Sequence, residues 1–438
     1  MSARDADTGE PPAKQRAIDP RSTPGISLPK SLSSTAPAAQ DQVLVIPQEA
    51  NLPIDAETRK VVARVSLAVV SVVSFDVDGD RLYKASGFII DFDKSSMIGT
   101  IISSATVNIH DPAFPDVEKI NIYLFDGVSY DATIIACDHH WNLLVLSVLF
   151  DRVVKTMKFV EINESRTARD AYHGIAMLQP HSTRYKLCPG DTIIGLGRQS
   201  QEPFGLQANR GIYSVERWAD LPKICQEMLR ATFINTFTAI GGPAINKKGN
   251  VIGMLFHSMS FTPFLPSNII LKWWDYFKTT GKYCRPMISF VGYNLHVARS
   301  SRWVDVPTSL HEGLDGILVE MVSRELLSAG LQEKDLIIRC NGKRVTTNLQ
   351  LFEVLVENIA KTVEVTIVKA ENAILNQYIF LWRRLSRNAS TSGQFHGTIR
   401  MDGSKDLFVT APVQSDSSPK MGVELGGALS QNELERWS

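Results

Sequence analysis

The sequence has few cysteines, no excess of either charge and no long apolar run, and each shortage excludes a class of protein. Its 438 residues include five cysteines, an odd number without CxxC spacing, which argues against a disulfide framework and a zinc knuckle. The 46 Lys and Arg balance the 46 Asp and Glu. The chain therefore lacks the broad basic field that sequence-independent binding to nucleic acid requires, and we expect no nucleic-acid partner.

The longest mainly apolar stretch, at 65–75, is rich in valine and shorter than the roughly 20 residues of a spanning helix. It predicts a buried strand, and we expect no membrane span. The N-terminal residues include Asp5, Asp7 and Glu10 and no apolar core of a signal peptide, which argues against a secretory signal or a typical transit peptide. With the scattered cysteines, this favours a cytoplasmic or nuclear location.

Composition divides the chain into four parts. Residues 1–53 are rich in proline, serine and alanine without a sustained period, which predicts a disordered arm. Short β-branched runs separated by turn residues follow over 54–284 and predict an all-β barrel or sandwich. A small α+β module is predicted over 285–385. The serine- and asparagine-rich remainder, 386–438, predicts a disordered tail.

Two helices have recognisable ends. One follows the strand-rich region, with Ser267 or Asn268 as its N-terminal cap and Gly281 as its stop. The other is predicted over 348–360 in the α+β module, from the helical spacing of its apolar residues.

The order of several motifs is typical of one protein family. The motifs are ASGFIID at 85–91, IGGPAINKKGNVIGMLF at 240–256, PSNIILKWW at 266–274 and AGLQEKDLIIRCNGKRV at 329–345. With them the chain resembles the HtrA/Deg serine proteases, and the degenerate Deg-like proteins of plants in particular. The resemblance implies a mainly β fold in which a trypsin-like double β-barrel precedes a small α+β PDZ-like domain, and it implies no cofactor.

A protease of this family needs a serine nucleophile, a histidine base, an aspartate that orients the histidine, and backbone N–H groups that form an oxyanion hole. In the matching stretches Thr106 stands where the base is expected, Asn142 where the acid is expected and Ile240 where the nucleophile is expected. Isoleucine has no heteroatom that could form an acyl-enzyme, and loss of the nucleophile alone costs about 10⁶ in turnover. The resemblance therefore implies a degenerate triad without catalytic residues.

The loop around the nucleophile position keeps its turn residues. Gly241, Gly242 and Pro243 match the family's oxyanion loop, and glycine adopts backbone angles that other residues cannot, so a structural role explains them. A repositioned base at His139 or His140 is disfavoured, because neighbouring residues of a strand or tight turn point in different directions. Adjacent histidines without a second spaced pair of ligands also make a poor zinc site, and we expect no metal.

PDZ domains bind an extended peptide as an added strand beside a helix, and a short loop holds the terminal carboxylate. The residues that match this loop are Met287, Ile288, Ser289 and Phe290. Serine at position 289 replaces a glycine of the family pattern, at a cost of about 1 kcal/mol where a positive φ is needed. This puts carboxylate capture in doubt but leaves recognition of an internal strand. Leu349, Phe352 and Leu355 are the helix candidates to line the groove, or else belong to the helix's own core face.

We therefore predict a catalytically inactive HtrA/Deg-like protein, a pseudoprotease that binds peptide segments or C-termini of other proteins through its PDZ-like module. Two alternatives stay open. One is an active serine endopeptidase of this family, acting in protein quality control. The other is a structural subunit in a homo-oligomer, or in a mixed oligomer with active Deg-like relatives, because family members commonly trimerise through the barrel.

Overall fold

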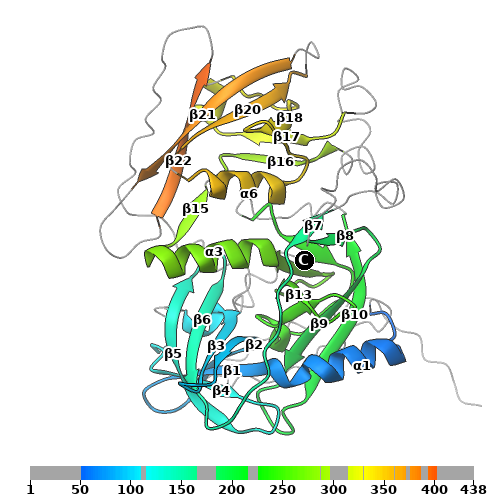
Figure 1. Cartoon of the computed structure of the whole chain (residues 1–438), viewed down its shortest axis with the longest axis vertical. Helices are drawn as coiled ribbons and strands as arrows, with labels where there is room; N and C mark the ends of the chain where they lie inside the picture. The colour runs from blue at the N-terminus through cyan, green and yellow to red at the C-terminus, as the bar shows by residue number, and fades with distance from the viewer. Residues whose placement is uncertain are drawn as a thin grey trace, which may run out of the picture. The chain divides into compact units, whose positions relative to one another are not determined.

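Two closed β-barrels, a connecting helix and a small α+β module make up the described part of the computed structural model (Figure 1). This confirms the predicted mainly β architecture. The predicted arm, 1–53, and tail, 386–438, lie mostly outside the described residues, as does Met287. The structure describes residues 51–109, 115–164, 184–215, 225–286, 288–295, 314–328, 330–359, 361–370, 375–385 and 393–401.

The first barrel is built from β-branched runs whose side chains fill its interior. Its strands follow the order β1-β2-β3-β6-β5-β4, and β1 closes the sheet because it pairs with both β2 and β4. The preceding helix, α1 (Ala56–Val65), begins at Asp55, whose carboxylate accepts a hydrogen bond from the Thr58 N–H at 2.7 Å. The other elements are η2 (Ser66–Ala68), β1 (Val69–Phe75), β2 (Arg81–Asp93), β3 (Ile98–Ser104), η3 (Ala105–Asn108), β4 (Lys119–Tyr123), β5 (Ser129–Asp138) and β6 (Leu143–Leu149).

The second barrel follows the order β10-β11-β14-β13-β12-β9. Its strand β9 pairs with β10 and β12 and also contacts β1 and β2 of the first barrel, so it lies where the barrels meet. A separate parallel pair joins β7 (Ile162–Glu164) to β8 (Tyr185–Leu187). The elements of the barrel are β9 (Thr192–Arg198), β10 (Leu206–Ser214), β11 (Leu229–Ala231), η4 (Phe237–Ala239), β12 (Pro243–Ile245), β13 (Val251–Leu255) and β14 (Thr262–Pro266).

The connecting helix, α3 (Ser267–Thr280), ends where the sequence predicts. Gly281 follows it with φ of 63°, a left-handed conformation that glycine adopts at low cost. The predicted N-terminal cap is wrong, because neither candidate side chain bonds the helix N-terminus. Ser267 Oγ instead donates to the carbonyl oxygen of Val160 at 2.6 Å, and Asn268 bonds the backbone of β7. Both side chains therefore bond the segment at the start of β7 and do not cap the helix.

The C-terminal module, β15 to β22, is one sheet with two helices among its described residues. Its strands follow the order β15-β22-β21-β20-β18-β17-β16, and β19 pairs with β18 across a turn in which Asn341 and Gly342 both have positive φ. The elements are β15 (Cys284–Pro286), β16 (Phe290–Asn294), β17 (Ile317–Val322), α5 (Arg324–Ser328), β18 (Leu336–Cys340), β19 (Lys343–Arg344), α6 (Asn348–Glu357), β20 (Thr362–Val368), β21 (Leu375–Leu385) and β22 (Gly393–Met401).

The module differs from the sequence prediction at two ends. The helix α6 ends at Glu357, three residues before the predicted end. The strand β22 lies inside the range predicted as a disordered tail, where it pairs antiparallel with β21 and parallel with β15. Its neighbours supply backbone hydrogen bonds that a serine- and glycine-rich composition does not reveal. The other domain boundaries stay predictions.

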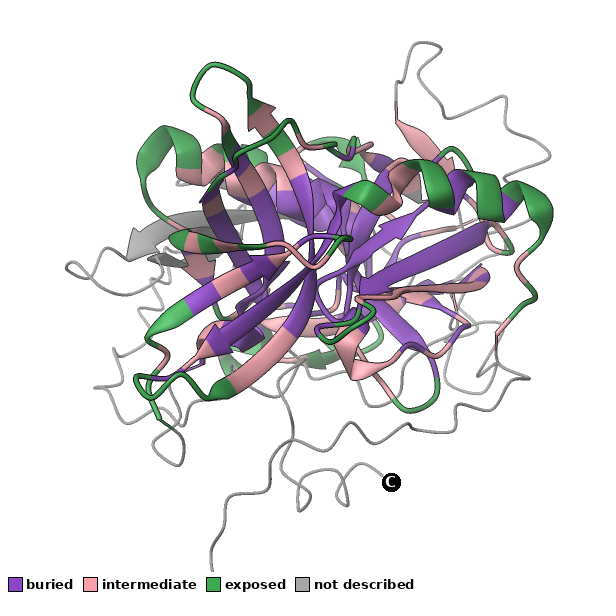
Figure 2. Cartoon of the chain, turned by 90° about the horizontal axis from the view of Figure 1, so that it is seen from below, coloured by how far each residue is buried: buried purple, intermediate pink, exposed green. Residues whose placement is uncertain are grey.

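The apolar core places α6 between two clusters. Buried residues run along the strands of both barrels (Figure 2). Leu349 and Phe352 belong to the cluster that fills the second barrel and packs under α3. Leu351, Val354 and Leu355 belong to the module's own cluster. The helix is therefore buried on two faces, one toward the barrels and one toward its own sheet.

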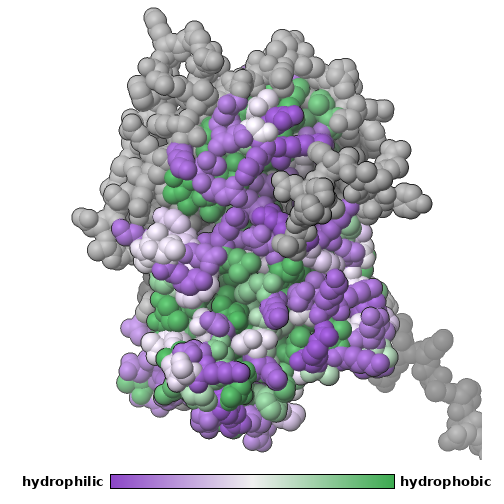
Figure 3. All heavy atoms as spheres, in the orientation of Figure 1, coloured by the Kyte–Doolittle hydropathy of each residue, from purple (hydrophilic) through white to green (hydrophobic). Residues whose placement is uncertain are grey.

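On the face that Figure 3 shows, the described residues mix hydrophilic and hydrophobic side chains. Ile98 and Leu149, which pair across β3 and β6, are among the exposed apolar residues. Small exposures of this kind are ordinary for a folded protein. Among the helices that the structure describes, none has the length and apolar content needed to cross a membrane.

Candidate functional site

Two of the three positions assigned to the triad form a closed ring of hydrogen bonds with Ser104. Ser104 Oγ donates to Asn142 Oδ1 at 2.8 Å, and Asn142 Nδ2 donates to Thr106 Oγ1 at 3.1 Å. The two hydroxyl oxygens lie 2.6 Å apart, which closes the ring. Thr106 and Asn142 are each only 6% exposed. The ring holds no group that exchanges a proton near neutral pH, so it offers hydrogen bonds but no general base.

The backbone of Asn142 explains why an amide residue suits this turn. Its φ is 51°, in the left-handed region, which asparagine adopts more readily than most residues. Its carbonyl oxygen accepts a hydrogen bond from the Ala105 N–H at 3.2 Å, which ties the turn to the end of β3. Asn142 therefore has a structural role in positioning η3 beside β6.

The third position, Ile240, lies on the loop after η4 and is 4% exposed. Its N–H donates to the carbonyl oxygen of Phe237 at 3.2 Å, and its carbonyl oxygen accepts from the Ser86 N–H at 2.7 Å. An oxyanion hole requires the N–H at the nucleophile position to point at the substrate. Here that donor is bonded inside the loop.

The next residues bring this loop against the first barrel. A Cβ atom on Gly241, whose φ is 80°, would lie 2.4 Å from Ser86 O and 2.7 Å from Ser104 N. A Cβ atom on Gly242 would lie 2.0 Å from Leu196 O. Both glycines are needed for this approach, and Pro243 then begins β12. Because Ser104 also belongs to the ring with Thr106 and Asn142, the loop that carries Ile240 lies beside this ring, so the three positions assigned to the triad are near one another where the barrels meet.

His257, which the sequence analysis did not single out, lies close to the same loop. Its ring packs against Phe237 with centroids 4.1 Å apart, and its Nδ1 lies 3.1 Å from Asn235 O. Burial lowers the pKa of His257 to about 4, although a hydrogen bond to Asn235 opposes this. The imidazole is therefore neutral at pH 7. A single histidine after a strand gives no sequence signal of this packing.

The two histidines considered as replacement bases lie at the end of β5. His139 is exposed, with Nε2 3.6 Å from Cys137 Sγ, and His140 packs edge-on against Trp141. Burial raises the pKa of Cys137 to about 11, so its thiol is not an activated nucleophile. Across the described ranges, no cluster of three or more His, Cys, Asp or Glu residues is arranged to hold a metal ion.

The second candidate site is the edge of β16 beside α6. Gln226 Nε2, from the turn before β11, donates to Phe290 O at 2.6 Å, and its Oε1 accepts from the Gly292 N–H at 2.9 Å. Asn348 Nδ2, at the start of α6, lies 2.8 Å from Gly292 O and 3.3 Å from Gln226 O. The edge is therefore bonded to a turn of the second barrel.

The other sequence candidates for peptide binding lie in three different surroundings. Ile288 packs against the module's own core, and the carbonyl oxygen of Ser289 accepts a hydrogen bond from Ser323 N–H at 3.0 Å. Leu355 also belongs to the module's core. Phe352 packs edge-on against Trp141 with ring centroids 5.6 Å apart. Of the helix candidates, Leu349 and Phe352 thus face the barrels.

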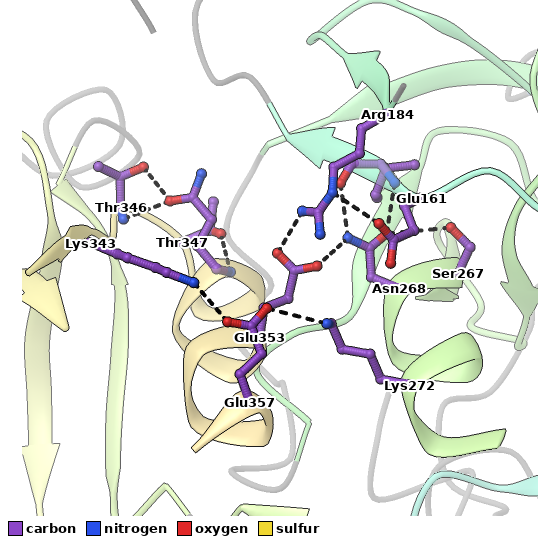
Figure 4. A network of polar contacts seen from close by, with 12 residues as sticks. Glu161, Arg184, Ser267, Asn268, Lys272, Lys343, Thr346, Thr347, Glu353 and Glu357 are labelled. Carbon is purple, nitrogen blue, oxygen red and sulfur yellow. Dashed lines mark hydrogen bonds and ion pairs between the residues drawn. The ribbon is translucent and has the colours of Figure 1, made fainter. Parts of the chain in front are cut away.

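A network of polar contacts accompanies this packing (Figure 4). The carboxylate of Glu353 pairs with Arg184 at 2.9 Å and accepts a hydrogen bond from Asn268 Nδ2 at 2.7 Å. Arg184 also pairs with Glu161 at 3.0 Å. One turn later, Glu357 pairs with Lys343 and, more loosely, with Lys272 of α3. The face of α6 toward the barrels therefore combines apolar packing with a partly buried ion pair.

The two closed β-barrels define a trypsin-like fold, and the α+β module follows them in the chain. No family model matches the chain. It is 25% identical over 278 residues to the serine protease Do-like HtrA of Bacillus subtilis (strain 168), over 57% of this chain and 55% of that protein. It is 24% identical over 300 residues to the serine protease HTRA3 of Homo sapiens, over 65% of this chain and 58% of that protein.

The chain was also compared with solved structures. The HtrA-type protease AlgW with tripeptide aligns with a TM-score of 0.47 and 15% identity, over 79% of this chain and 99% of that chain. The chain spans only a little more than half the length of the curated relatives named above. The sequence matches show homology with HtrA-type serine proteases at low identity.

Proposed function

We propose that this chain is a non-catalytic relative of the HtrA-type serine proteases, similar to the degenerate Deg-like proteins of plants, and that it binds extended peptide segments through β16 and α6. It acts as a pseudoprotease with a binding or regulatory role. The observation that carries the proposal is the state of Ile240, which has no nucleophilic atom, is buried, and uses its own N–H inside the loop.

The surroundings of Ile240 support the same reading. The ring of Ser104, Thr106 and Asn142 supplies hydrogen bonds where a protease needs a base and its orienting acid. The neighbouring hydroxyl Thr238 bonds Gln207 at 3.1 Å, and His257 bonds Asn235.

Peptide binding is the activity that the remaining chemistry favours. Strand addition uses backbone N–H and C=O groups of a sheet edge, so it survives the loss of catalytic side chains. β16 lies at one end of the module's strand order and has α6 beside it. The neutral net charge suits recognition by backbone and apolar contacts better than electrostatic capture.

The absence of proteolysis is tested with a fluorophosphonate probe and a casein cleavage assay on the full chain. We expect neither labelling nor cleavage above the level of a boiled control. The variant Ile240→Ser should stay unlabelled as well, because the base is missing and the loss of a triad member leaves only about 10³–10⁴-fold catalysis over water. Covalent labelling of the unmodified chain at any Ser or Thr would overturn the proposal.

Two further expectations are part of this proposal. We place the protein in the cytoplasm or nucleus, where its free cysteines stay reduced. We also propose that it assembles with itself or with active relatives, which sedimentation of the chain alone and of a mixture with such a relative would test. A strictly monomeric mass in both samples would contradict the assembly.

A further inference from the structure

The side chain of Gln226 makes the same kind of hydrogen bonds to the edge of β16 that a bound peptide would make. A primary amide carries a donor and an acceptor close together, as a peptide group does. A strand added to β16 would bond alternate residues of the edge. Gln226 bonds the carbonyl of Phe290 and the N–H of Gly292, which are alternate residues. It therefore takes two of the backbone groups that an added strand would use.

Asn348 completes the occupation of the edge. The remaining backbone group of Gly292, its carbonyl oxygen, lies 2.8 Å from Asn348 Nδ2, so both hydrogen-bonding groups of this residue are satisfied by side-chain amides. Asn348 also lies 3.3 Å from the backbone oxygen of Gln226. Strand, helix and turn are thus held together at the place where a peptide would enter.

The apolar contacts of α6 follow the same pattern. Phe352, one turn beyond Asn348, packs against Trp141 of the first barrel, and Leu349 joins the barrel cluster. Glu353 beside them pairs with Arg184. A peptide bound along α6 would need these apolar side chains, which the barrels now cover.

We propose that residues 225–228 act as an internal ligand of the β16 edge, so that peptide binding and docking of α6 on the barrels exclude one another. This inference rests on the proposed function. The external ligand it predicts is an extended segment with main-chain amides opposite Phe290 and Gly292. Such a segment carries a large apolar or aromatic side chain that replaces Trp141 on Phe352.

A simpler role would be protection of the sheet edge. Exposed strand edges invite unwanted pairing with other chains, and proteins commonly cover them. Protection alone requires that Gln226 covers the edge. It does not require that any peptide gains access when Gln226 is removed. The two readings therefore differ in what happens to peptide affinity.

The test compares the full chain with two variants, Gln226→Ala and Gln201→Ala. Gln201 is the matched control, because it is exposed and its side chain makes no hydrogen bond within the described part of the chain. The probes are peptides selected on Gln226→Ala from a phage library of random sequences and synthesised with amidated C-termini. Their Kd is measured by fluorescence polarisation, and exchange of the Gly292 amide by hydrogen–deuterium exchange.

We expect Gln226→Ala to expose the Gly292 amide to exchange and to bind the selected peptides about tenfold more tightly than the unmodified chain, on the scale of one to two neutral hydrogen bonds. Gln201→Ala should match the unmodified chain in both measurements. Protected amides elsewhere in β17 and β18 show that the variant has kept its fold.

Three outcomes would overturn the inference. Equal peptide affinity for the unmodified chain and Gln226→Ala would overturn it and leave the proposed function standing. An unchanged exchange rate of the Gly292 amide would show that Gln226 does not hold the edge. Faster exchange without any selected binder would overturn both the inference and the proposed peptide binding, and leave edge protection as the role of Gln226.

Discussion

At the scale of single residues, the positions assigned to the triad have structural roles. Asn142 holds two partners, Ser104 and Thr106, and occupies a left-handed backbone conformation. Substitution separates the role of the amide from that of the backbone conformation. Glycine adopts the left-handed conformation but has no amide, whereas alanine has no amide and does not favour that conformation.

We predict that Asn142→Gly lowers the free energy of unfolding by about 1–2 kcal/mol, because two buried hydroxyls lose a partner. Asn142→Ala should cost a further ~1 kcal/mol from backbone strain. Urea denaturation of both variants measures the difference. Equal stability of the two would contradict the role of the backbone conformation, and full stability of both would contradict the role of the amide.

A second prediction at this scale concerns His257. Burial lowers its pKa to about 4 in the folded chain, below the unperturbed value of 6.5 expected after unfolding. The unfolded chain therefore takes up the proton first as the pH falls. The stabilising effect of the neutral ring is complete above pH 6.5 and is lost progressively toward pH 4.

This corresponds to a loss of about 2 kcal/mol between pH 7.5 and pH 5. Urea denaturation at the two pH values measures it, and His257→Gln should show a smaller loss over the same interval. An identical pH dependence in both proteins would mean that His257 is accessible to protonation in the folded state.

At the scale of elements, α6 shows what a sequence pattern can and cannot predict. The spacing of its apolar residues predicts a helix, and Thr347 caps it by accepting a hydrogen bond from Gln350 N–H at 2.9 Å. The same spacing cannot tell whether Phe352 faces a groove, the module or the barrels. That choice depends on Trp141, which lies far away in the sequence.

Some of the other elements also follow from sequence patterns, and others do not. The barrels follow from β-branched runs between turn residues, and the end of α3 follows from Gly281. The contacts of Gln226 join residues 64 and 66 positions apart, so no local pattern indicates them. The strand β22 was missed because its neighbours in the sheet, rather than its composition, determine its structure.

The docking of α6 gives a prediction at this scale. Glu353→Ala removes one of the two carboxylate partners of Arg184 and an acceptor of Asn268, at a side chain only 10% exposed. We therefore expect a loss of about 2–3 kcal/mol and faster amide exchange in α6. Glu357→Ala is the control. Its carboxylate is exposed, as is its partner Lys343, and its contact with Lys272 is loose, so its pairs should contribute less than about 1 kcal/mol. Similar losses in the two variants would contradict a special role for Glu353.

At the scale of the whole molecule, Arg198 joins the two barrels. Its guanidinium, on β9 of the second barrel, donates to the carbonyl oxygens of Ser66, Val69 and Phe204 at 2.5–2.8 Å. Ser66 and Val69 belong to the segment that opens the first barrel. Burial lowers the pKa of Arg198 to about 10, so it stays charged at neutral pH.

We predict that Arg198→Met lowers the free energy of unfolding by about 3 kcal/mol or more, because one buried and two partly buried carbonyl oxygens lose their donor. Arg64→Met is the control, since Arg64 is exposed and donates only to Lys248 O. Urea denaturation followed by tryptophan fluorescence and circular dichroism compares them. If Arg198→Met unfolds like the control, the barrels are held together by their apolar contacts alone.

The close approach of Gly242 to Leu196 has a consequence for how such chains are recognised. The glycine is required by the backbone of a neighbouring strand and has no need of a nucleophile beside it. A signature built on the Gly-Gly-Pro turn therefore detects the barrel whether or not the barrel performs chemistry. In a chain of this architecture, the residue just before the two glycines, here Ile240, is the position that indicates whether a nucleophile is present.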